Sequence, residues 1–239
     1  EGAPPHWQPQ TAVLPMDLNG APIELMGEQG LGDELFFLRF LPALKSRGAT
    51  VTYRVGNDRL LSLLAPWVTG GLLDQLVAHN APRQDGALRL LAGDLPFALG
   101  ARDYPPALKL QPTPQAMARL VQKLPSLERN PQRPRLGLTW RAGTMQSATG
   151  FGTNRWLCKQ MPLTQLLEVL RPLDVDVVVL QRNPQPEELL AIERALGAHR
   201  CLDASAIDQD LEELLALLSS VDSLVGVSNT NVHLMAAMG

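Results

Sequence analysis

The sequence predicts an α/β protein with two halves, each a parallel sheet covered by helices. In both halves, short apolar or β-branched segments alternate with helical segments, which is typical of parallel sheets. A stretch rich in proline separates the halves, and 239 residues suffice for two domains of about 100–120 residues each. We therefore expect an N-terminal arm or remnant at 1–20, a first Rossmann-like domain at 21–111, a helix-bearing linker at 112–133 and a second Rossmann-like domain at 134–239.

The first half begins with a strand, a glycine loop and a helix. Ile23–Met26 predicts the strand and Glu34–Lys45 the helix, in which Pro42 should produce a kink. Further along, a strand is predicted at Thr50–Val55, a short helix at Arg59–Trp67 and a strand region at Leu72–His79. The pattern of Leu88–Leu95 fits either a strand or a helix. A further helix, Pro114–Leu124, is expected within the linker.

The second half repeats the alternation. Its strands are expected at Arg135–Trp140, Val175–Gln181, Arg200–Asp203 and Ser223–Val227, and its helices at Pro162–Leu170, Glu187–Leu196, Asp210–Ser219 and Val232–Met238. Val175–Gln181 is apolar almost throughout, as a buried parallel strand should be. Ligands of open α/β sheets bind at the carboxyl ends of strands, so we expect a ligand site in a cleft between the halves.

The charge and cysteine content narrow the function classes. With 21 basic and 24 acidic residues, the net charge of −3 argues against nucleic acid or an anionic membrane as the main partner. Cys158 and Cys201 form no short motif, which favours a reducing, cytoplasmic setting. No apolar run approaches the ~20 residues of a membrane helix, and no signal peptide is recognisable. The first residue is not methionine, so we expect a longer parent chain.

The first candidate constellation is the glycine loop Met26–Asp33. A strand that turns through glycines into a helix brings backbone N–H groups to the edge of a sheet, which suits a polar ligand. The spacing of Gly27, Gly30 and Gly32 fits neither a dinucleotide fingerprint nor a P-loop. Asp33 has two interpretations that are compatible with each other: a helix cap, or a carboxylate that accepts a proton as general base.

The second constellation follows the last predicted strand. Ser228, Asn229, Thr230 and Asn231 are four consecutive small polar residues before a helix that contains His233. Their hydroxyl, amide and N–H groups favour contact with a diphosphate, because one helix cap needs fewer polar residues. The structural alternative is a cap cluster with His233 as an ordinary helix residue.

The third constellation is the loop from Thr139 to Lys159. Positive side chains there would neutralise phosphates, although a solvated loop is the alternative for part of this set: Arg141, Arg155 and Lys159, with Trp140 and Trp156. Gln181 ends the apolar strand at the same sheet edge, where glutamine is usually a turn residue. The four histidines and two cysteines have no metal-ligand spacing, so we expect no metal site.

Three motifs occur together in this sequence: Gly30-Leu31-Gly32-Asp33 followed by Leu41-Pro42-Ala43-Leu44, then Leu136-Gly137-Leu138-Thr139-Trp140, and finally Gly226–Leu234 with Ala237-Met238-Gly239. Together they resemble the motifs of bacterial glycosyltransferase family nine, the heptosyltransferase-like enzymes. The similarity is greatest to the branch often fused to tetratricopeptide repeats. Such a fusion would place an upstream repeat region in the longer parent chain.

This resemblance implies a GT-B fold, with two Rossmann-like domains facing across a cleft. It implies metal-independent, inverting transfer of a sugar from a nucleotide-diphosphate-sugar to a hydroxyl of a glycan, lipid-linked or protein acceptor, with no cofactor. Asp33 maps to the family's base. Gln29, Gly30 and Gly32 then form the acceptor-side loop, and the donor side comprises Thr139, Trp140, Lys159, Gln181, Ser228, Asn229, Thr230 and His233.

The sequence departs from the family pattern at two points. Ser228 stands where members usually carry an Asp that contacts the donor, and the chain ends at Gly239, so the second domain is expected to be incomplete. These departures keep open an alternative function, a degenerate GT-B module that binds or scaffolds without turnover. A third hypothesis, a two-domain oxidoreductase, is disfavoured by the absence of G-x-G-x-x-G.

Overall fold

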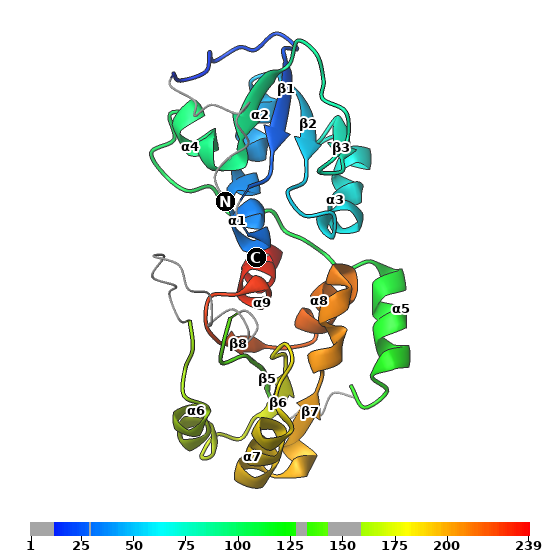
Figure 1. The fold of residues 1–239 in the computed structure, drawn as a ribbon, viewed down its shortest axis with the longest axis vertical. Coiled ribbons are helices and arrows are strands. Elements are labelled where there is room, and N and C mark those ends of the chain that lie inside the picture. Colours follow the sequence, from blue (N-terminus) through cyan, green and yellow to red (C-terminus); the bar gives the residue numbers. More distant parts are fainter. Residues whose placement is uncertain (1–11, 29, 128–132, 143–158) are drawn as a thin grey trace, which may run out of the picture. The chain divides into compact units, whose positions relative to one another are not determined.

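The computed structural model describes residues 12–28, 30–127, 133–142 and 159–239. The chain forms two compact units, residues 1–110 with 237–239 and residues 111–236. Each unit contains a four-stranded parallel sheet, with strand orders β3-β2-β1-β4 and β7-β6-β5-β8 (Figure 1). The two orders are equivalent. In each unit the first strand is central, the second and third strands are added on one side of it, and the fourth strand pairs with its other side.

The first unit confirms the predicted alternation. Its strands are β1 (Pro22–Met26), β2 (Thr50–Arg54), β3 (Gln75–Val77) and β4 (Leu88–Leu91). Its helices are α1 (Leu31–Phe37), α2 (Leu41–Ser46), α3 (Leu60–Thr69) and α4 (Leu95–Ala98). The ambiguous segment 88–95 is a strand followed by a 3-10 turn, Ala92–Asp94.

The predicted helix Glu34–Lys45 is in fact two helices. It begins earlier, at Leu31, and a 3-10 turn at Leu38–Phe40 separates α1 from α2. Pro42 lies in the first turn of α2, where its missing N–H costs nothing. The helix is therefore interrupted just before Pro42, where a kink was expected, and α1 is only seven residues long.

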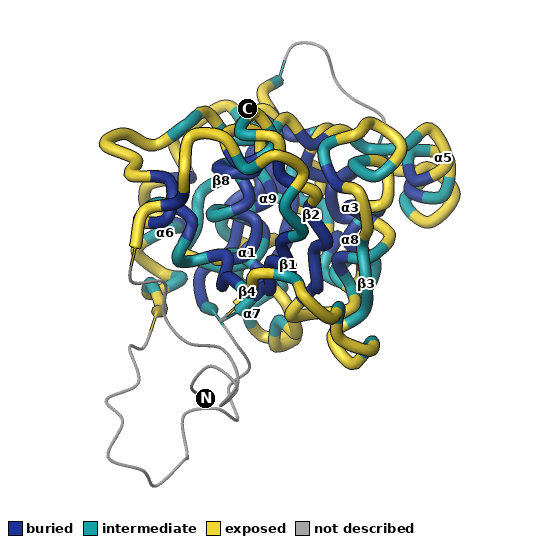
Figure 2. Tube along the Cα trace, turned by 90° about the horizontal axis from the view of Figure 1, so that it is seen from above, coloured by how far each residue is buried: buried dark blue, intermediate teal, exposed yellow. Residues whose placement is uncertain are grey.

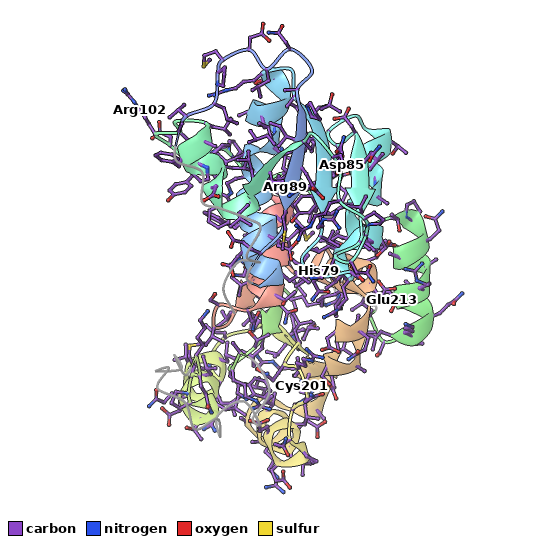
Figure 3. The ribbon with its side chains drawn as sticks, turned by 45° about the horizontal axis from the view of Figure 1, so that its top comes forward. His79, Asp85, Arg89, Arg102, Cys201 and Glu213 are labelled. Carbon is purple, nitrogen blue, oxygen red and sulfur yellow. The ribbon has the colours of Figure 1, made fainter. Side chains whose placement is uncertain are left out.

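Arg54 and Glu24 organise one face of the first sheet. Both side chains are buried, and the Arg54 guanidinium donates to the Glu24 carboxylate through Nε (2.8 Å) and Nη2. The same guanidinium donates to four backbone carbonyls of the β3–β4 connection, those of Ala78, His79, Ala81 and Pro82. Residues 78–87, all described by the structure, contain no helix, so Arg54 holds this connection in place (Figure 3, where His79 is labelled).

The second unit also follows the predicted order. Its strands are β5 (Arg135–Leu138), β6 (Asp176–Val179), β7 (Cys201–Asp203) and β8 (Ser223–Val225). Its helices are α5 (Pro114–Lys123), α6 (Leu163–Leu170), α7 (Pro186–Leu196), α8 (Leu211–Leu218) and α9 (Thr230–Met238), whose last residues cluster with the first unit. Side chains of β5 and β6 form a buried core with α6 and α7.

The helix predicted inside the linker is α5, and it packs against α8. Glu213 of α8, which is labelled in Figure 3, has a side chain only 3% exposed. Its carboxylate forms ion pairs with two side chains of α5, Lys123 through Nζ at 2.5 Å and Arg119 through Nε at 3.0 Å. Figure 2 shows that the opposite face of α5 is exposed. Among the described residues, α5 is therefore an integral part of the second unit.

Candidate active site

The glycine loop of the first unit leads from β1 into α1 at the carboxyl edge of the sheet. Gly30 caps α1 in an extended conformation, and its N–H donates to Asp33 Oδ2 at 3.3 Å. Asp33 is nonetheless exposed in the first turn of the helix, and Gly32 is half-buried beside it. Asp33 therefore caps the helix and still presents its carboxylate to solvent. Gln29, predicted for the same loop, lies outside the described residues.

Two carboxylates near Asp33 were missed by the sequence analysis. Glu28 is half-buried, and a Cβ on Gly93 would lie 2.7 Å from its Oε1. Burial raises the pKa of Glu28, and the charges of Asp94 and Asp33 raise it further, against a backbone hydrogen bond from Gly93 that lowers it. Because Gly93 follows β4, no sequence signal connects it to Glu28. The edge between β1 and β4, where the strand order reverses, is therefore acidic.

The second missed carboxylate is Glu34, which follows Asp33 directly. It is buried, and its Oε2 accepts hydrogen bonds from the Tyr53 hydroxyl at 2.7 Å and the Gly56 N–H at 2.9 Å. Burial raises its pKa more than these two hydrogen bonds lower it. In the sequence Glu34 resembles an ordinary acidic residue of a first helical turn. Its partners, Tyr53 on β2 and Gly56 just beyond β2, come 19 and 22 positions later.

The corresponding edge of the second unit lies where β5 and β8 end. Thr139 and Asn229 follow these two strands, and Asn229 Nδ2 donates to Thr139 Oγ1 at 2.9 Å. Gly226 permits this approach, because a Cβ there would lie 2.0 Å from the same hydroxyl oxygen. The structure thus brings together two predicted donor-side residues, which are bonded to each other.

The small polar cluster after β8 forms the start of α9. Asn229 Oδ1 accepts from the backbone N–H groups of Asn231 (3.0 Å) and Val232 (3.3 Å), so Asn229 caps the helix. Asn231 is buried and donates to the Leu180 carbonyl at 3.1 Å, which fixes α9 to the end of β6. The exposed Ser228 lies with its Oγ 3.3 Å from His233 Nε2, while Thr230 is half-buried. Ser228 is therefore the exposed member of the cluster, Asn229, Thr230 and His233 are half-buried, and Asn231 is buried.

Gln181 and Trp140 are directed into the protein. Gln181 Oε1 accepts from the backbone N–H groups of both Trp140 and Arg141, each at 2.9 Å, and the residue is buried. Trp140 is 1% exposed, and its indole N–H donates to Glu188 Oε1 at 2.8 Å. In this structure both side chains support the edge from within, and neither presents a free polar group to a ligand.

Glu188, which accepts from the Trp140 indole, also forms an ion pair with Arg141. Arg141 donates to it and, through Nη2, to the Asn183 carbonyl at 2.8 Å. Burial alone would raise the pKa of Glu188, but hydrogen bonds from Arg141, Gln185 and Trp140 together hold it below the usual range. Most of the charge of Arg141 is therefore compensated inside the unit.

Lys159 returns to the same edge through a short antiparallel pairing. The N–H of Ala142 donates to the Lys159 carbonyl at 2.9 Å, Met161 N–H donates to the Trp140 carbonyl at 2.7 Å, and Arg141 bridges to Gln160. Lys159 is exposed. The pairing therefore brings the backbone of Lys159 close to the residues that follow β5. Arg155, Trp156 and Cys158 lie outside the described residues.

Neither a metal cluster nor a membrane span is found in the described part of the chain. There, no group of three or more His, Cys, Asp or Glu side chains is arranged to hold a metal ion. Within the same residues, no helix has the length and apolar character to cross a bilayer.

Solved structures with this arrangement are known. A glycosyltransferase family 9 protein from Veillonella parvula DSM 2008 superimposes with a TM-score of 0.63 over 94% of this chain and 80% of its own, at 12% identity. The chain shares the fold of this family 9 structure. The mixed α/β architecture with two parallel sheets, and with it the expected GT-B class, is confirmed.

A second neighbour is TibC from enterotoxigenic Escherichia coli H10407, an iron-containing dodecameric glycosyltransferase. It gives a TM-score of 0.57 at 16% identity, over 93% of this chain and 57% of its own. A further TibC structure, described as a heptosyltransferase in complex with ADP-D-β-D-heptose, gives 0.56 at 15% identity over the same shares.

Sequence comparison gives one relative among curated proteins. Protein FlbA of Caulobacter vibrioides is 27% identical over an alignment 252 positions long, which covers 93% of this chain. The chain spans only 39% of the length of FlbA. No family model matches the chain.

Proposed function

We propose that this chain carries out inverting sugar transfer from a nucleotide-diphosphate-sugar to an acceptor hydroxyl, without an essential metal or cofactor. The observation that carries the proposal is the exposed carboxylate of Asp33 on the first turn of α1, at the carboxyl edge of a family 9 fold. An exposed carboxylate at that edge can accept the proton of a bound hydroxyl. Ligands of open α/β sheets bind at this edge.

In the proposed reaction Asp33 takes the proton of the acceptor hydroxyl. The acceptor oxygen attacks the anomeric carbon, the bond from that carbon to the diphosphate oxygen breaks, and the diphosphate leaves with the electron pair. Lys159 and the start of α9, with Ser228, Thr230 and His233, stabilise the charge that develops on the diphosphate. Thr139, Asn229, Trp140 and Gln181 hold this edge in shape through the hydrogen bonds described above.

The choice of donor class is supported by the neighbour that binds ADP-D-β-D-heptose. We propose a nucleotide-diphosphate-sugar as donor and a cytoplasmic reaction with a glycan, lipid-linked or protein acceptor. An upstream tetratricopeptide region in a longer parent chain remains part of this proposal, consistent with the share of FlbA that the chain leaves uncovered.

The experiment compares wild type with Asp33→Asn on a panel of nucleotide-diphosphate-sugars that includes ADP-D-β-D-heptose. Release of nucleotide diphosphate should fall about 100-fold or more, the usual contribution of a general base. Affinity for the free nucleotide diphosphate should be unchanged. Asp85→Asn, at an exposed aspartate of the β3–β4 connection, is the matched control and should retain wild-type turnover. Turnover within a few-fold of wild type in Asp33→Asn would exclude Asp33 as the base.

A binding module without turnover is the second candidate. It is favoured by Ser228, which replaces the acid expected there, and by the mutual engagement of Thr139 and Asn229. Thermal shift with ADP, UDP and GDP separates the outcomes. Stabilisation by a nucleotide diphosphate without turnover of any sugar donor supports the binding module, whereas stabilisation with turnover supports the transferase.

A further inference from the structure

The side chain of Glu34 joins three segments of the first unit. It belongs to the first turn of α1, and its Oε2 accepts from the Tyr53 hydroxyl on β2 (2.7 Å) and from the N–H of Gly56, just beyond β2 (2.9 Å). The residue is 1% exposed. A buried carboxylate with two donors is a firm connection, because each lost partner would leave a polar group unsatisfied.

Two glycines make room for this carboxylate. A Cβ on Gly27, directly after β1, would lie 1.9 Å from Glu34 Oε2 and 2.6 Å from the Tyr53 hydroxyl. A Cβ on Gly56 would lie 2.8 Å from Glu34 Oε1. Neither glycine has a positive φ, so the requirement is for space and not for backbone conformation. The ends of β1 and β2 are therefore both shaped around Glu34.

The helix that carries Glu34 depends on this anchor. α1 has seven residues and passes directly into a 3-10 turn, and an isolated helix of that length has little stability of its own. Successive residues of an α-helix differ in direction by about 100°. With Glu34 fixed inward, the preceding residue, Asp33, is directed outward, where the structure shows it exposed.

We propose that Glu34 is the positioning residue for Asp33. It does not touch substrate, because it is buried; it fixes the rotation and the height of the first turn of α1 and thereby the place of the Asp33 carboxylate. The inference rests on the proposed role of Asp33 as base. It goes beyond that role by assigning a purpose to Glu34, Tyr53, Gly27 and Gly56.

The experiment compares Glu34→Ala, Glu34→Gln and Tyr53→Phe with a matched control. The control is Glu24→Gln, which alters a buried carboxylate of β1 that is bonded to Arg54 and lies on the face of the sheet opposite to Tyr53 by strand alternation. We expect Glu34→Ala to lower kcat about 100-fold with the donor KM within threefold, since a misplaced base costs that much. Glu34→Gln keeps an acceptor oxygen and should restore kcat to within about fivefold, with Tyr53→Phe between the two.

Hydrogen exchange of the substrate-free protein gives a second measurement that does not depend on turnover. Amides of residues 31–36 should exchange faster in Glu34→Ala and Tyr53→Phe than in Glu24→Gln. If wild type turns over no sugar donor, the proposed function fails, and exchange alone decides whether Glu34 holds this turn. Unchanged exchange, kcat within threefold of wild type in Glu34→Ala, or an equal loss of kcat in Glu24→Gln would overturn the inference.

Discussion

The carboxyl edges of the two sheets have equivalent strand order and opposite chemistry. The edge of the first unit carries Glu28, Asp33 and Glu34, whereas that of the second is lined by hydroxyl and amide side chains with the exposed Lys159. Both are stabilised from within, the first by a buried carboxylate and the second by the amide of Gln181. One topology therefore presents an acidic edge in the first unit and an edge lined by amides, hydroxyls and an exposed lysine in the second, because the residues that follow the strands differ.

The largest effect is expected from removing the amide at the second edge. Gln181→Leu leaves the backbone N–H groups of Trp140 and Arg141 without their acceptor, at a cost of about 1–3 kcal/mol for each buried donor. Gln181→Glu retains an acceptor oxygen and should lose less. Urea unfolding of both variants measures the difference, and equal stability of the two would show that the amide oxygen is not the supporting group.

Each edge contains a glycine, and replacing the two glycines by alanine should have different effects on ADP binding. Gly226→Ala forces a methyl group against Thr139 Oγ1, and Gly27→Ala forces one against Glu34, each costing about 1–3 kcal/mol through overpacking. Calorimetric titration should show weaker ADP binding in Gly226→Ala and unchanged binding in Gly27→Ala. An equal loss of ADP affinity in the two variants would contradict the expectation that ADP binds at the edge of the second unit.

The buried Glu34 and the half-buried Glu188 should give pH dependences of opposite sign. The pKa of Glu34 is raised above 4.5 by burial, so its contribution to stability is complete at low pH and is lost as the pH rises through the folded-state pKa. The pKa of Glu188 is lowered despite burial, so its contribution is present above 4.5 and is lost as the pH falls through the folded-state pKa. Unfolding free energies should be measured between pH 3 and 8. As the pH rises, the stability of wild type relative to Glu34→Gln should decrease, and its stability relative to Glu188→Gln should increase.

The smallest effect is expected at α5. The Arg119 side chain is 41% exposed, and exposed ion pairs contribute little, so Arg119→Ala should lower Tm by no more than about 2 °C. Lys123 remains to pair with Glu213. Nucleotide binding and turnover should match wild type, as measured with the assays above. A larger drop in Tm would show that α5 relies on Arg119 for its attachment.

Local patterns predicted the elements, whereas non-local contacts determined the roles of their residues. Periodicity and Pro42 predicted β1, the division of the first helix and the buried strand β6. The inward direction of Gln181 was not predictable, because it depends on the backbone amides of two residues that follow β5, 40 and 41 positions away. Glu24 was also missed, since its partner Arg54 comes from another strand. The roles assigned to Asp33, Ser228 and Lys159 stay predictions.

The attachment of α5 to α8 determines where this chain can be divided. A chimaera joined at 133/134 would separate α5 from the second unit and leave Glu213, 3% exposed, without Arg119 and Lys123. Removing the partners of a buried charge costs about 3–5 kcal/mol. A junction at 110/111 takes α5 and α8, and the ion pairs between them, from the same parent protein. Recombination between related chains, in the laboratory or in evolution, should therefore favour crossover points before α5 over those after it.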